Sequence, residues 1–346
     1  MRFGIGQYAN QFRLLSQIYG VRRALRTSYK VVKTQLRGLP NDISIEAAGG
    51  CNLKCPMCIQ AVPERTKARI ATGLLSFDDF KSVVDDVADF AIQISLFYRG
   101  EPTINKDLPR MIRYATDRGL LTYINTNGLM LRHAWMRREL IDAGLHRMHV
   151  SVDGANPETY ETYRVGGNLH DVVSYVRAFM NDRGSRKIPI VALQTIATKR
   201  TLPEFDSYVE MAKTTGVDKA FAASMHLDQY KRDPTPPELE DAIVGHEFSR
   251  YASVENGRAV KKDLGHTTCP WNQSLYIDSD GTAIHCCYDQ AAETSFGNVF
   301  QTGVKNLWFR PDYVRWRDDV AKPMTMTMCE SCTATSASWH DLWVKD

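Results

Sequence analysis

Long apolar segments are absent from this chain of 346 residues. No run of 18 or more apolar residues occurs, so no transmembrane helix is expected. The sequence also lacks the basic, apolar and cleavage regions of a secretory signal. These absences predict a cytoplasmic protein, and in that reducing compartment clustered cysteines bind metal or carry out chemistry more often than they form disulfides.

Acidic residues are absent from positions 1–40, which hold eight arginines and lysines, whereas the whole chain has a net charge of only +3. Apolar residues recur in this segment at roughly helical spacing: Phe12, Leu15, Ile18, Tyr19, Val21, Leu25 and Tyr29. A basic amphipathic helix can lie on an anionic membrane surface or bind an anionic partner. The alternative is a helix that packs on the main domain with its basic face in solvent. We expect this second arrangement, with weak membrane-surface contact through residues 1–40 as the other hypothesis.

Apolar runs and helical patterns alternate from residue 42 onward. The expected strands cover residues 42–48, 91–100, 120–128, 146–154, 187–197 and 218–226. The expected helices cover residues 76–90, 108–119, 135–144, 170–183 and 202–216. Strands that are apolar on both faces and alternate with helices are typical of a parallel sheet with crossover helices. This α/β pattern predicts an open sheet or a partial barrel.

The alternation ends near residue 228, where the sequence becomes polar and rich in proline. One helix is expected there, at 236–251. The turn "DSDG" at 278–281 lies between two apolar runs and predicts a β-hairpin, and a helix with a restart at Pro311 is expected at 303–320. The expected domains are a basic helical segment at 1–41, the α/β region at 42–227, a linker at 228–268 and a cysteine-containing extension at 269–346.

Cysteine is missing between positions 58 and 269, so the eight cysteines form two groups. Cys51, Cys55 and Cys58 follow the first strand in the stretch "GGCNLKCPMC". Thiolates suit iron–sulfur clusters and zinc. A structural zinc site needs four ligands, and no fourth cysteine or histidine is nearby. The incomplete set predicts a metal centre with a position left for an exchangeable ligand, and therefore chemistry.

The Cys-x3-Cys-x2-Cys loop after the first strand resembles the radical S-adenosylmethionine (SAM) superfamily. The resemblance implies a partial (β/α)6 barrel in which Cys51, Cys55 and Cys58 hold a [4Fe–4S] cluster and SAM chelates the fourth iron. One electron then cleaves SAM to methionine and a 5′-deoxyadenosyl radical, which abstracts a hydrogen atom from the substrate. A donor such as flavodoxin or ferredoxin would supply the electron.

Further segments resemble the family. The stretch "RGEP" resembles its Gly-Gly-Glu-Pro motif, which implies that Gly100 and Glu101 hold the SAM amino group, although Arg99 stands where glycine is usual. That arginine would change the strand edge or face the substrate. Met57 stands where the family places a side chain against the adenine.

Two later strand ends complete the predicted SAM site. The stretch "SVDG" resembles a family segment near the SAM carboxylate and ribose, which makes Ser151 and Asp153 candidates. Gln194 on the fifth strand would reach the same groups. The alternative is that Ser151 and Gln194 are simply polar residues at strand ends.

The second cysteine group resembles the SPASM extension, or its shortened twitch form. The resemblance implies one auxiliary [4Fe–4S] cluster held by Cys269, Cys286, Cys329 and Cys332, and a structural zinc site is the alternative. Cys287 is left over. It is a candidate hydrogen-atom donor for an epimerase, unless it is a small buried residue or exchanges roles with Cys286.

The shortness of residues 1–41 argues against the peptide-binding N-terminal domain of many peptide-modifying members. We therefore expect a polar, carbohydrate-like substrate such as a sugar, aminocyclitol or nucleoside, with oxidation, epimerisation or decarboxylation as the outcome, and no nucleic-acid partner. Polar groups at the expected strand ends would line the pocket: Tyr98, Arg99, Tyr123, Asn125, Asn127, Gln194 and His226. Oxidation needs a base, for which Arg99, Asp153 and His226 are candidates. The alternatives are a maturase or epimerase of a ribosomal peptide, and a non-catalytic iron–sulfur or zinc protein.

Overall fold

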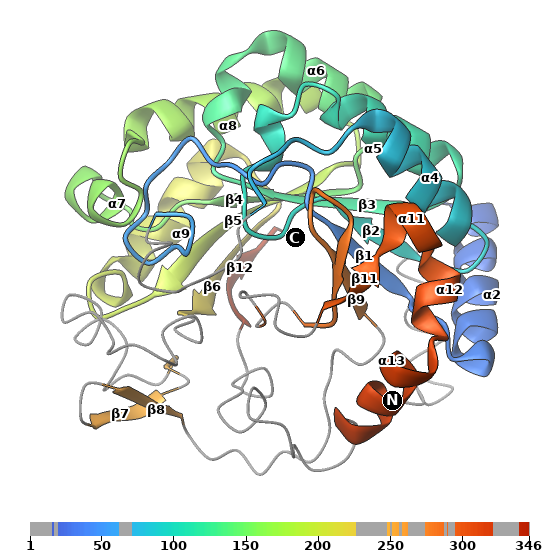
Figure 1. The fold of residues 1–346 in the computed structure, drawn as a ribbon. Helices are drawn as coiled ribbons and strands as arrows, with labels where there is room; N and C mark the ends of the chain where they lie inside the picture. The colour runs from blue at the N-terminus through green and yellow to red at the C-terminus, as the bar shows by residue number, and fades with distance from the viewer. Residues whose placement is uncertain are drawn as a thin grey trace.

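A ten-stranded sheet organises the protein. The computed structural model describes residues 16, 20–61, 71–225, 248–249, 251–255, 258–261, 274–286, 289, 295–320 and 339–345. Helices lie along the outer side of the curved row of strands (Figure 1). The predicted α/β class and the partial barrel are confirmed.

Six parallel strands form the centre of the sheet and follow one another in chain order. They are β1 (Asp42–Ile45), β2 (Gln93–Ser95), β3 (Leu121–Thr126), β4 (Arg147–Ser151), β5 (Ile190–Ala197) and β6 (Lys219–Ser224). Each lies within a predicted strand. Their carboxyl ends therefore meet at one rim, which is where parallel barrels carry their functional residues.

Crossover helices connect these strands: α4 (Phe77–Val87), α5 (Leu108–Asp117), α6 (Ala134–Asp142), α8 (Leu169–Arg183) and α9 (Phe205–Thr215). All five were predicted. The Ser76 side chain caps α4 by accepting a hydrogen bond from the Asp79 amide at 3.1 Å, and Asn168 caps α8 by accepting one from the Asp171 amide at 3.2 Å. The short helices η1 (Pro102–Ile104), η2 (Leu129–Arg132), η3 (Leu202–Glu204) and α7 (Pro157–Tyr163) were not predicted separately.

The strands divide their side chains between two faces. In β3, Thr122, Ile124 and Thr126 are buried, and Ile124 belongs to the large apolar core shared by the strands and the helices. Tyr123 and Asn125 alternate with them and are only half-buried. This period-two alternation points Tyr123 and Asn125 into the interior of the barrel.

The C-terminal region extends the same sheet instead of forming a separate one. On one edge, β9 (Ser274–Ile277) pairs in parallel with β1, and β10 (Thr282–Ile284) and β11 (Ser295–Asn298) continue from it. On the other edge, β12 (Trp339–Val344) pairs antiparallel with β6. Strand β12 was not predicted. These additions give partners to the backbone groups that the open edges of β1 and β6 would otherwise expose.

The hairpin predicted around "DSDG" joins β9 to β10, and Gly281 has a φ of +86°, a conformation that favours glycine. The helix predicted at 303–320 is two helices, α12 (Val304–Trp308) and α13 (Pro311–Val320), preceded by α11 (Val299–Thr302). Pro311 starts α13, as expected of proline at a first helical position.

Part of the predicted linker is a two-stranded sheet, formed by β7 (Tyr251–Glu255) and β8 (Arg258–Lys261). The prediction that a helix extends to Tyr251 is therefore wrong at that residue, because Tyr251 begins a strand and is buried. Phe248 and Ser249 are not helical either, and the remaining residues of that expected helix lie outside the described residues. The exact domain boundaries stay predictions.

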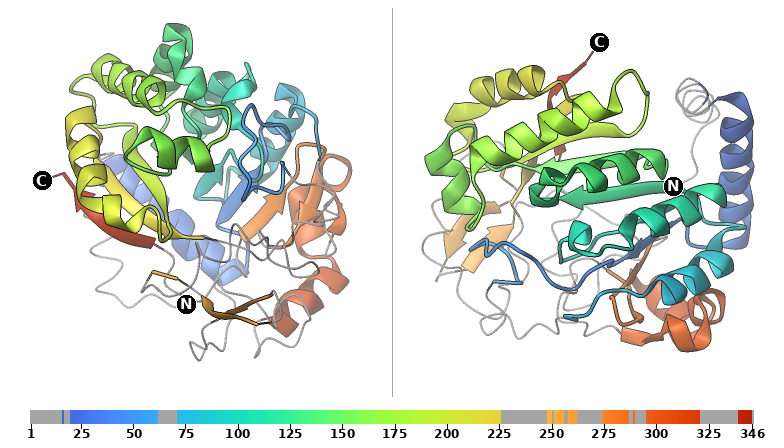
Figure 2. Two further views of the ribbon diagram at one scale, coloured as in Figure 1. Left: turned by 90° about the vertical axis from the view of Figure 1, so that its left-hand side faces the viewer. Right: turned by 90° about the horizontal axis from the view of Figure 1, so that it is seen from above.

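The N-terminal helix α2 (Val21–Arg37) lies at the edge of the molecule (Figures 1 and 2). It packs on the domain, but not with the predicted face. Lys30 and Thr34 are buried, whereas the apolar Leu25 is 57% exposed and Tyr29 is 68% exposed. Lys30 Nζ and Thr34 Oγ1 donate hydrogen bonds to the carbonyl oxygens of Ala91 and Phe90. The side that carries Lys30 and Thr34 faces inward because these carbonyls, between α4 and β2, accept its donors, whereas Arg22, Arg26 and Arg37 are exposed.

Within the part of the chain that the structure describes, no helix is long and apolar enough to cross a membrane.

Candidate functional site

The loop of three cysteines follows β1 at the carboxyl rim of the barrel. Backbone hydrogen bonds attach it to two neighbouring loops, from the Glu101 amide to the Gly50 oxygen (2.8 Å) and from the Lys54 amide to the Val165 oxygen (2.9 Å). Cys55 is buried, Cys58 is half-buried and Cys51 is exposed. The triad therefore follows the first strand, as the sequence predicted, and the role of each cysteine as a cluster ligand stays a prediction.

The three thiols influence one another electrostatically. Burial, more than any other effect, raises the pKa of all three, and that of Cys58 reaches about 11, with Cys55 and Cys51 adding to the increase. Cys51 Sγ also accepts hydrogen bonds from the Leu53 amide (3.4 Å) and from Asn127 Nδ2 (3.9 Å). Hydrogen-bond donors aimed at the Cys51 sulfur would stabilise a metal-bound thiolate.

Among the described residues, no three cysteine, histidine or acidic side chains are close enough to hold a single metal ion. An iron–sulfur cluster needs a wider spacing of its ligands than a single ion does, because each thiolate binds its own iron. Three thiolates on one loop, within electrostatic range of one another, therefore fit an iron–sulfur cluster.

Arg164 joins this site, although sequence reasoning did not single it out. The positive charge of Arg164 lowers the pKa of Cys55, which burial raises. Arg164 Nε lies 2.5 Å from Asp153 Oδ2, and Asp153 Oδ1 accepts a hydrogen bond from the Ile196 amide at 2.8 Å. Asp153 is 0% exposed, so its observed contacts position Arg164 beside the cysteine loop. The predicted contact of Asp153 with SAM and its role as a base stay predictions.

The "RGEP" loop packs directly against the cysteine loop. A Cβ atom on Gly100 would lie 1.9 Å from the Ala48 oxygen, so only glycine fits. The Glu101 carboxylate accepts hydrogen bonds from Thr126 Oγ1 (2.6 Å) and the Asn127 amide (2.7 Å). It therefore fixes the loop to the end of β3. The roles of Gly100 and Glu101 in holding the SAM amino group stay predictions.

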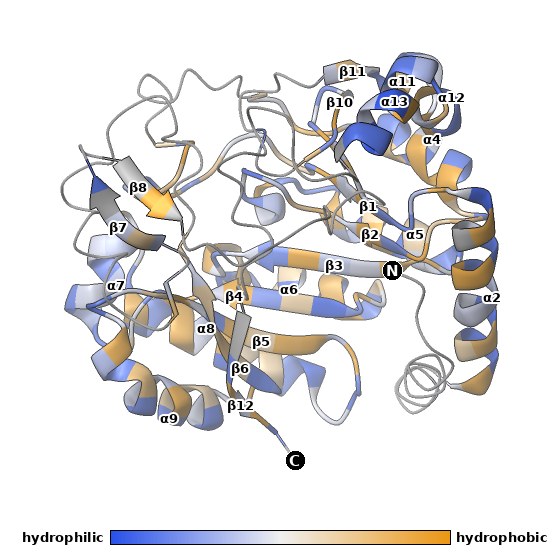
Figure 3. Cartoon of the chain, turned by 90° about the horizontal axis from the view of Figure 1, so that it is seen from below, coloured by the Kyte–Doolittle hydropathy of each residue, from blue (hydrophilic) through white to orange (hydrophobic). Residues whose placement is uncertain are grey.

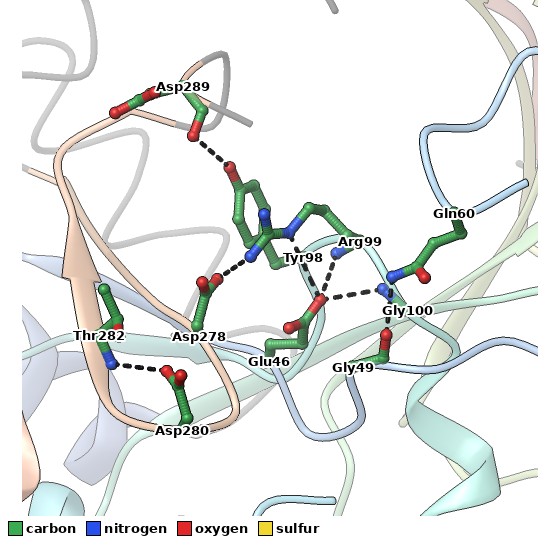
Figure 4. Close-up of polar contacts among 10 residues, drawn as sticks. All are labelled: Glu46, Gly49, Gln60, Tyr98, Arg99, Gly100, Asp278, Asp280, Thr282 and Asp289. Atoms are coloured by element: carbon green, nitrogen blue, oxygen red, sulfur yellow. Dashed lines mark hydrogen bonds and ion pairs between the residues drawn. The ribbon is translucent and has the colours of Figure 1, made fainter. Parts of the chain in front are cut away.

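Arg99, which departs from the family motif, makes a buried ion pair with Asp278 of the C-terminal hairpin (Figure 4). Its Nε also lies 3.8 Å from Glu46 Oε1. The three side chains are 2%, 0% and 1% exposed. Burial raises the pKa of Glu46 to about 7, even though Arg99 lowers it. Arg99 thus connects the SAM-motif loop to the extension, and among its described contacts it does not act as a free cation facing substrate.

A second contact supports the same connection. Tyr98 Oη donates a hydrogen bond to the Asp289 backbone oxygen at 3.4 Å (Figure 4). The Tyr98 ring lies 5.6 Å from that of Tyr276 on β9. Cys286 lies between Tyr276 and Asp289 in the chain and is buried. The end of β2 therefore holds the segment that carries a predicted auxiliary-cluster ligand.

Asn125, Ser151 and Gln194 come together from three neighbouring strands. Ser151 Oγ donates to Asn125 Oδ1 at 3.0 Å, and Asn125 Nδ2 lies 3.5 Å from Gln194 Oε1. Ser151 and Gln194 were predicted to contact SAM and Asn125 to line the substrate pocket, and these roles stay predictions. Met57, predicted to lie against the adenine, packs with Leu53 in a small apolar cluster.

An aromatic row lies deeper in the barrel. Tyr123 Oη and His149 Nδ1 are 2.5 Å apart, and the His149 ring contacts Phe221 at 4.8 Å. Burial, with help from Arg147, lowers the pKa of His149 to about 3, so its imidazole is neutral. Sequence reasoning named Tyr123 but missed His149. The signal was available, because residue 149 shares the inward face with Ser151, two positions later.

Four of the tail cysteines and one candidate base lie outside the described residues: Cys269, Cys287, Cys329, Cys332 and His226. The ligand set of the auxiliary cluster and the hydrogen-donor role of Cys287 therefore stay predictions.

Comparisons with known proteins agree with this geometry. The family profile described as the radical SAM superfamily matches residues 45–211, and the SPASM profile, described as an iron–sulfur cluster-binding domain, matches residues 269–333. Among solved structures, SuiB of Streptococcus suis bound to S-adenosylmethionine has a TM-score of 0.61 at 16% identity, covering 96% of this chain and 84% of that one. BtrN in complex with AdoMet and 2-DOIA has a TM-score of 0.54 at 15% identity, covering 86% and 94%. At these identities the likeness is one of fold.

Curated relatives are more similar in sequence. PqqA peptide cyclase of Granulibacter bethesdensis is 32% identical over 326 residues, which covers 87% of this chain and 81% of that protein. AdoMet-dependent heme synthase of Methanosarcina barkeri is 32% identical over 179 residues, 51% of this chain. This chain spans 48% of that heme synthase and 57% of GTP 3′,8-cyclase of Desulforamulus reducens.

A parallel partial barrel with a three-thiolate loop at its carboxyl rim defines a class of SAM-dependent iron–sulfur enzyme. This chain belongs to the radical SAM superfamily. It is a radical SAM enzyme with a SPASM domain. Its cofactors are a [4Fe–4S] cluster, SAM and auxiliary iron–sulfur clusters.

Proposed function

We propose that this enzyme modifies a peptide by hydrogen-atom abstraction. The observation that carries the proposal is the 32% identity to PqqA peptide cyclase across 87% of the chain. A further PqqA peptide cyclase, from Rhodopseudomonas palustris, is 33% identical over 62% of the chain. The comparisons therefore favour the peptide alternative over the carbohydrate-like substrate predicted from the sequence. The short segment at residues 1–41 is therefore no argument against a peptide substrate, because a relative named for a peptide reaction matches most of this chain.

Three groups of residues in the barrel would have separate roles in this reaction. Cys51, Cys55 and Cys58 would hold the cluster, which supplies the electron that cleaves SAM when it is bound. Asn125, Ser151 and Gln194 would orient SAM through their hydrogen bonds. The row of Tyr123, His149 and Phe221 lies deeper in the barrel and would close it against water beneath the reacting atoms.

The auxiliary cluster would accept or relay an electron, with flavodoxin or ferredoxin as the external donor. The contacts of Tyr98 and Arg99 with the Cys286 segment support this proposal, because they fix the extension to the SAM loop. Oxidation, epimerisation and cross-linking are all open outcomes for the substrate radical.

The test is an anaerobic assay of the reconstituted full-length chain with SAM and dithionite. Synthetic peptides made from each short reading frame beside the gene would be compared with a panel of aminocyclitols, sugars and nucleosides. We expect one peptide to stimulate 5′-deoxyadenosine formation and to lose two hydrogen atoms, or to gain one deuterium in deuterated water, by mass spectrometry.

A Cys58→Ala variant is the matched control, because it removes a predicted cluster ligand and should abolish both signals. Stimulation by a sugar or aminocyclitol, and by no peptide, would overturn the proposal in favour of the carbohydrate reading. Absence of any SAM cleavage would instead support a non-catalytic iron–sulfur protein.

A further inference from the structure

The helix α2 packs on the domain through a mixed face on which Ala24, Thr27, Lys30, Val31 and Thr34 are buried. Lys30 and Thr34 donate hydrogen bonds to carbonyl oxygens that follow α4, and Arg23 donates one to the Leu120 oxygen between α5 and β3 at 3.1 Å. Burial lowers the pKa of Lys30 to about 8, an effect that Arg26 reinforces. Burying a lysine while apolar side chains stay in water reverses the usual arrangement of an amphipathic helix.

The opposite side of α2 is an apolar stripe, consisting of Val21, Leu25, Tyr29, Val32 and Leu36, which are between 48% and 83% exposed. Their spacings of three and four residues place all five on one face. Figure 3 shows apolar residues recurring along this helix. Large apolar side chains gathered in one stripe on a surface mark an interaction site, whereas single ones do not.

Cations flank the stripe. Arg22, Arg26 and Arg37 are exposed, and α2 contains no acidic residue. Beside the stripe, a hollow of about 490 Å³ is lined by Arg22, Arg23, Arg26, Thr116, Asp117 and Gly119. Three guanidinium groups around one hollow outnumber its single carboxylate, so the hollow suits a phosphate group.

We propose that α2 seats the enzyme on an anionic phospholipid surface. The apolar stripe would enter the boundary between headgroups and acyl chains, and the arginines beside it would contact lipid phosphates, with one headgroup in the hollow. An apolar face bordered by cations is the pattern of interfacial helices. The proposal does not depend on the identity of the substrate.

A second copy of the chain is a poorer occupant of the stripe. Pairing α2 with α2 would bring two sets of exposed arginines together with no acidic residue of either helix to compensate them. An anionic bilayer would bury the apolar stripe and would also bring negative charge to the arginines beside it.

The experiment is flotation of the reconstituted full-length enzyme with vesicles of phosphatidylcholine alone or with about 30% phosphatidylglycerol. We expect binding to the anionic vesicles that weakens as NaCl rises, because exposed cations near a membrane are screened by salt. Each such cation contributes roughly 1 kcal/mol, or about fivefold, so Arg22→Gln/Arg26→Gln should weaken partitioning about 30-fold.

Leu25→Gln/Leu36→Gln should weaken partitioning about tenfold or more for each leucine, through lost burial in lipid. Matched controls are Arg113→Gln/Arg138→Gln and Trp135→Gln, which alter exposed residues on α5 and α6 and should leave binding unchanged. Circular dichroism and iron content confirm that each variant is folded.

The proposal is overturned if wild-type enzyme binds neither vesicle, or if the control variants lose binding as much as the α2 variants. It is also overturned if light scattering shows a dimer that the Leu25→Gln/Leu36→Gln change dissolves, because a second copy would then cover the stripe.

Discussion

The ion pair between Arg99 and Asp278 makes a strong prediction about stability. The two side chains are 2% and 0% exposed and come from segments 179 residues apart in the chain. Asp278→Asn keeps the shape of the side chain and removes its charge. Among its described contacts Arg99 then keeps the carboxylate of Glu46, whose Oε1 lies 3.8 Å from Arg99 Nε.

Removing one partner of a buried ion pair typically costs about 3–5 kcal/mol. Here the lower end applies, because Asp278 raises the pKa of Glu46 in addition to the larger effect of burial. Without Asp278, Glu46 ionises more readily and compensates Arg99 in part. We therefore expect Asp278→Asn to lower the free energy of unfolding by about 3 kcal/mol.

The assay is urea denaturation of the anaerobic protein, with Asp278→Asn, Arg99→Met and the double variant Arg99→Met/Asp278→Leu. The double variant should recover most of the loss, since replacing both partners by apolar groups is often neutral. Asp280→Asn is the control, because that side chain lies two residues away in the same turn and is exposed. A loss below about 0.5 kcal/mol for Asp278→Asn, or additive effects in the double variant, would refute the reasoning.

Three further predictions concern the same region. The pKa of Glu46 is raised by burial from 4.5 to about 7, so the free energy of unfolding should fall by about 2 kcal/mol as pH rises from about 5 to 7, and Glu46→Gln should flatten that slope in urea titrations at each pH. A steeper slope in the variant would contradict the assignment. Gly100→Ala places a Cβ 1.9 Å from the Ala48 oxygen and should abolish SAM cleavage, measured as 5′-deoxyadenosine; wild-type turnover would show that the loop tolerates the change. Cys58→Ser should remove about half of the iron of the reconstituted protein, because one of two clusters is lost, and unchanged iron would reject Cys58 as a ligand.

Local patterns in the sequence predicted the parallel core well. Each of the six strands is an apolar run and each of the five crossover helices has a helical spacing of apolar residues. Both patterns involve residues close together in the chain, so they can be read from the sequence alone. The cysteine loop and the "RGEP" loop were predicted for the same reason. Strand β12 was missed, because six residues near the end of the chain form a strand only when β6 offers an edge.

Long-range partners could not be predicted. The role of Arg99 depends on Asp278, and no local pattern indicates which residue will meet a buried charge. The orientation of α2 was wrong for a related reason. Periodicity identified its apolar face, but the carbonyl oxygens beside Lys30 and Thr34 determine which face packs.

The edges of the parallel sheet have a consequence for synthesis. Strand β9 covers β1 and strand β12 covers β6, and both covering strands are made after the six-stranded core is complete. The growing chain therefore passes through a stage at which both edges expose unpaired backbone groups, which favours aggregation. The core is therefore protected from pairing with another copy only after both covering strands, β9 and β12, have been made and have paired.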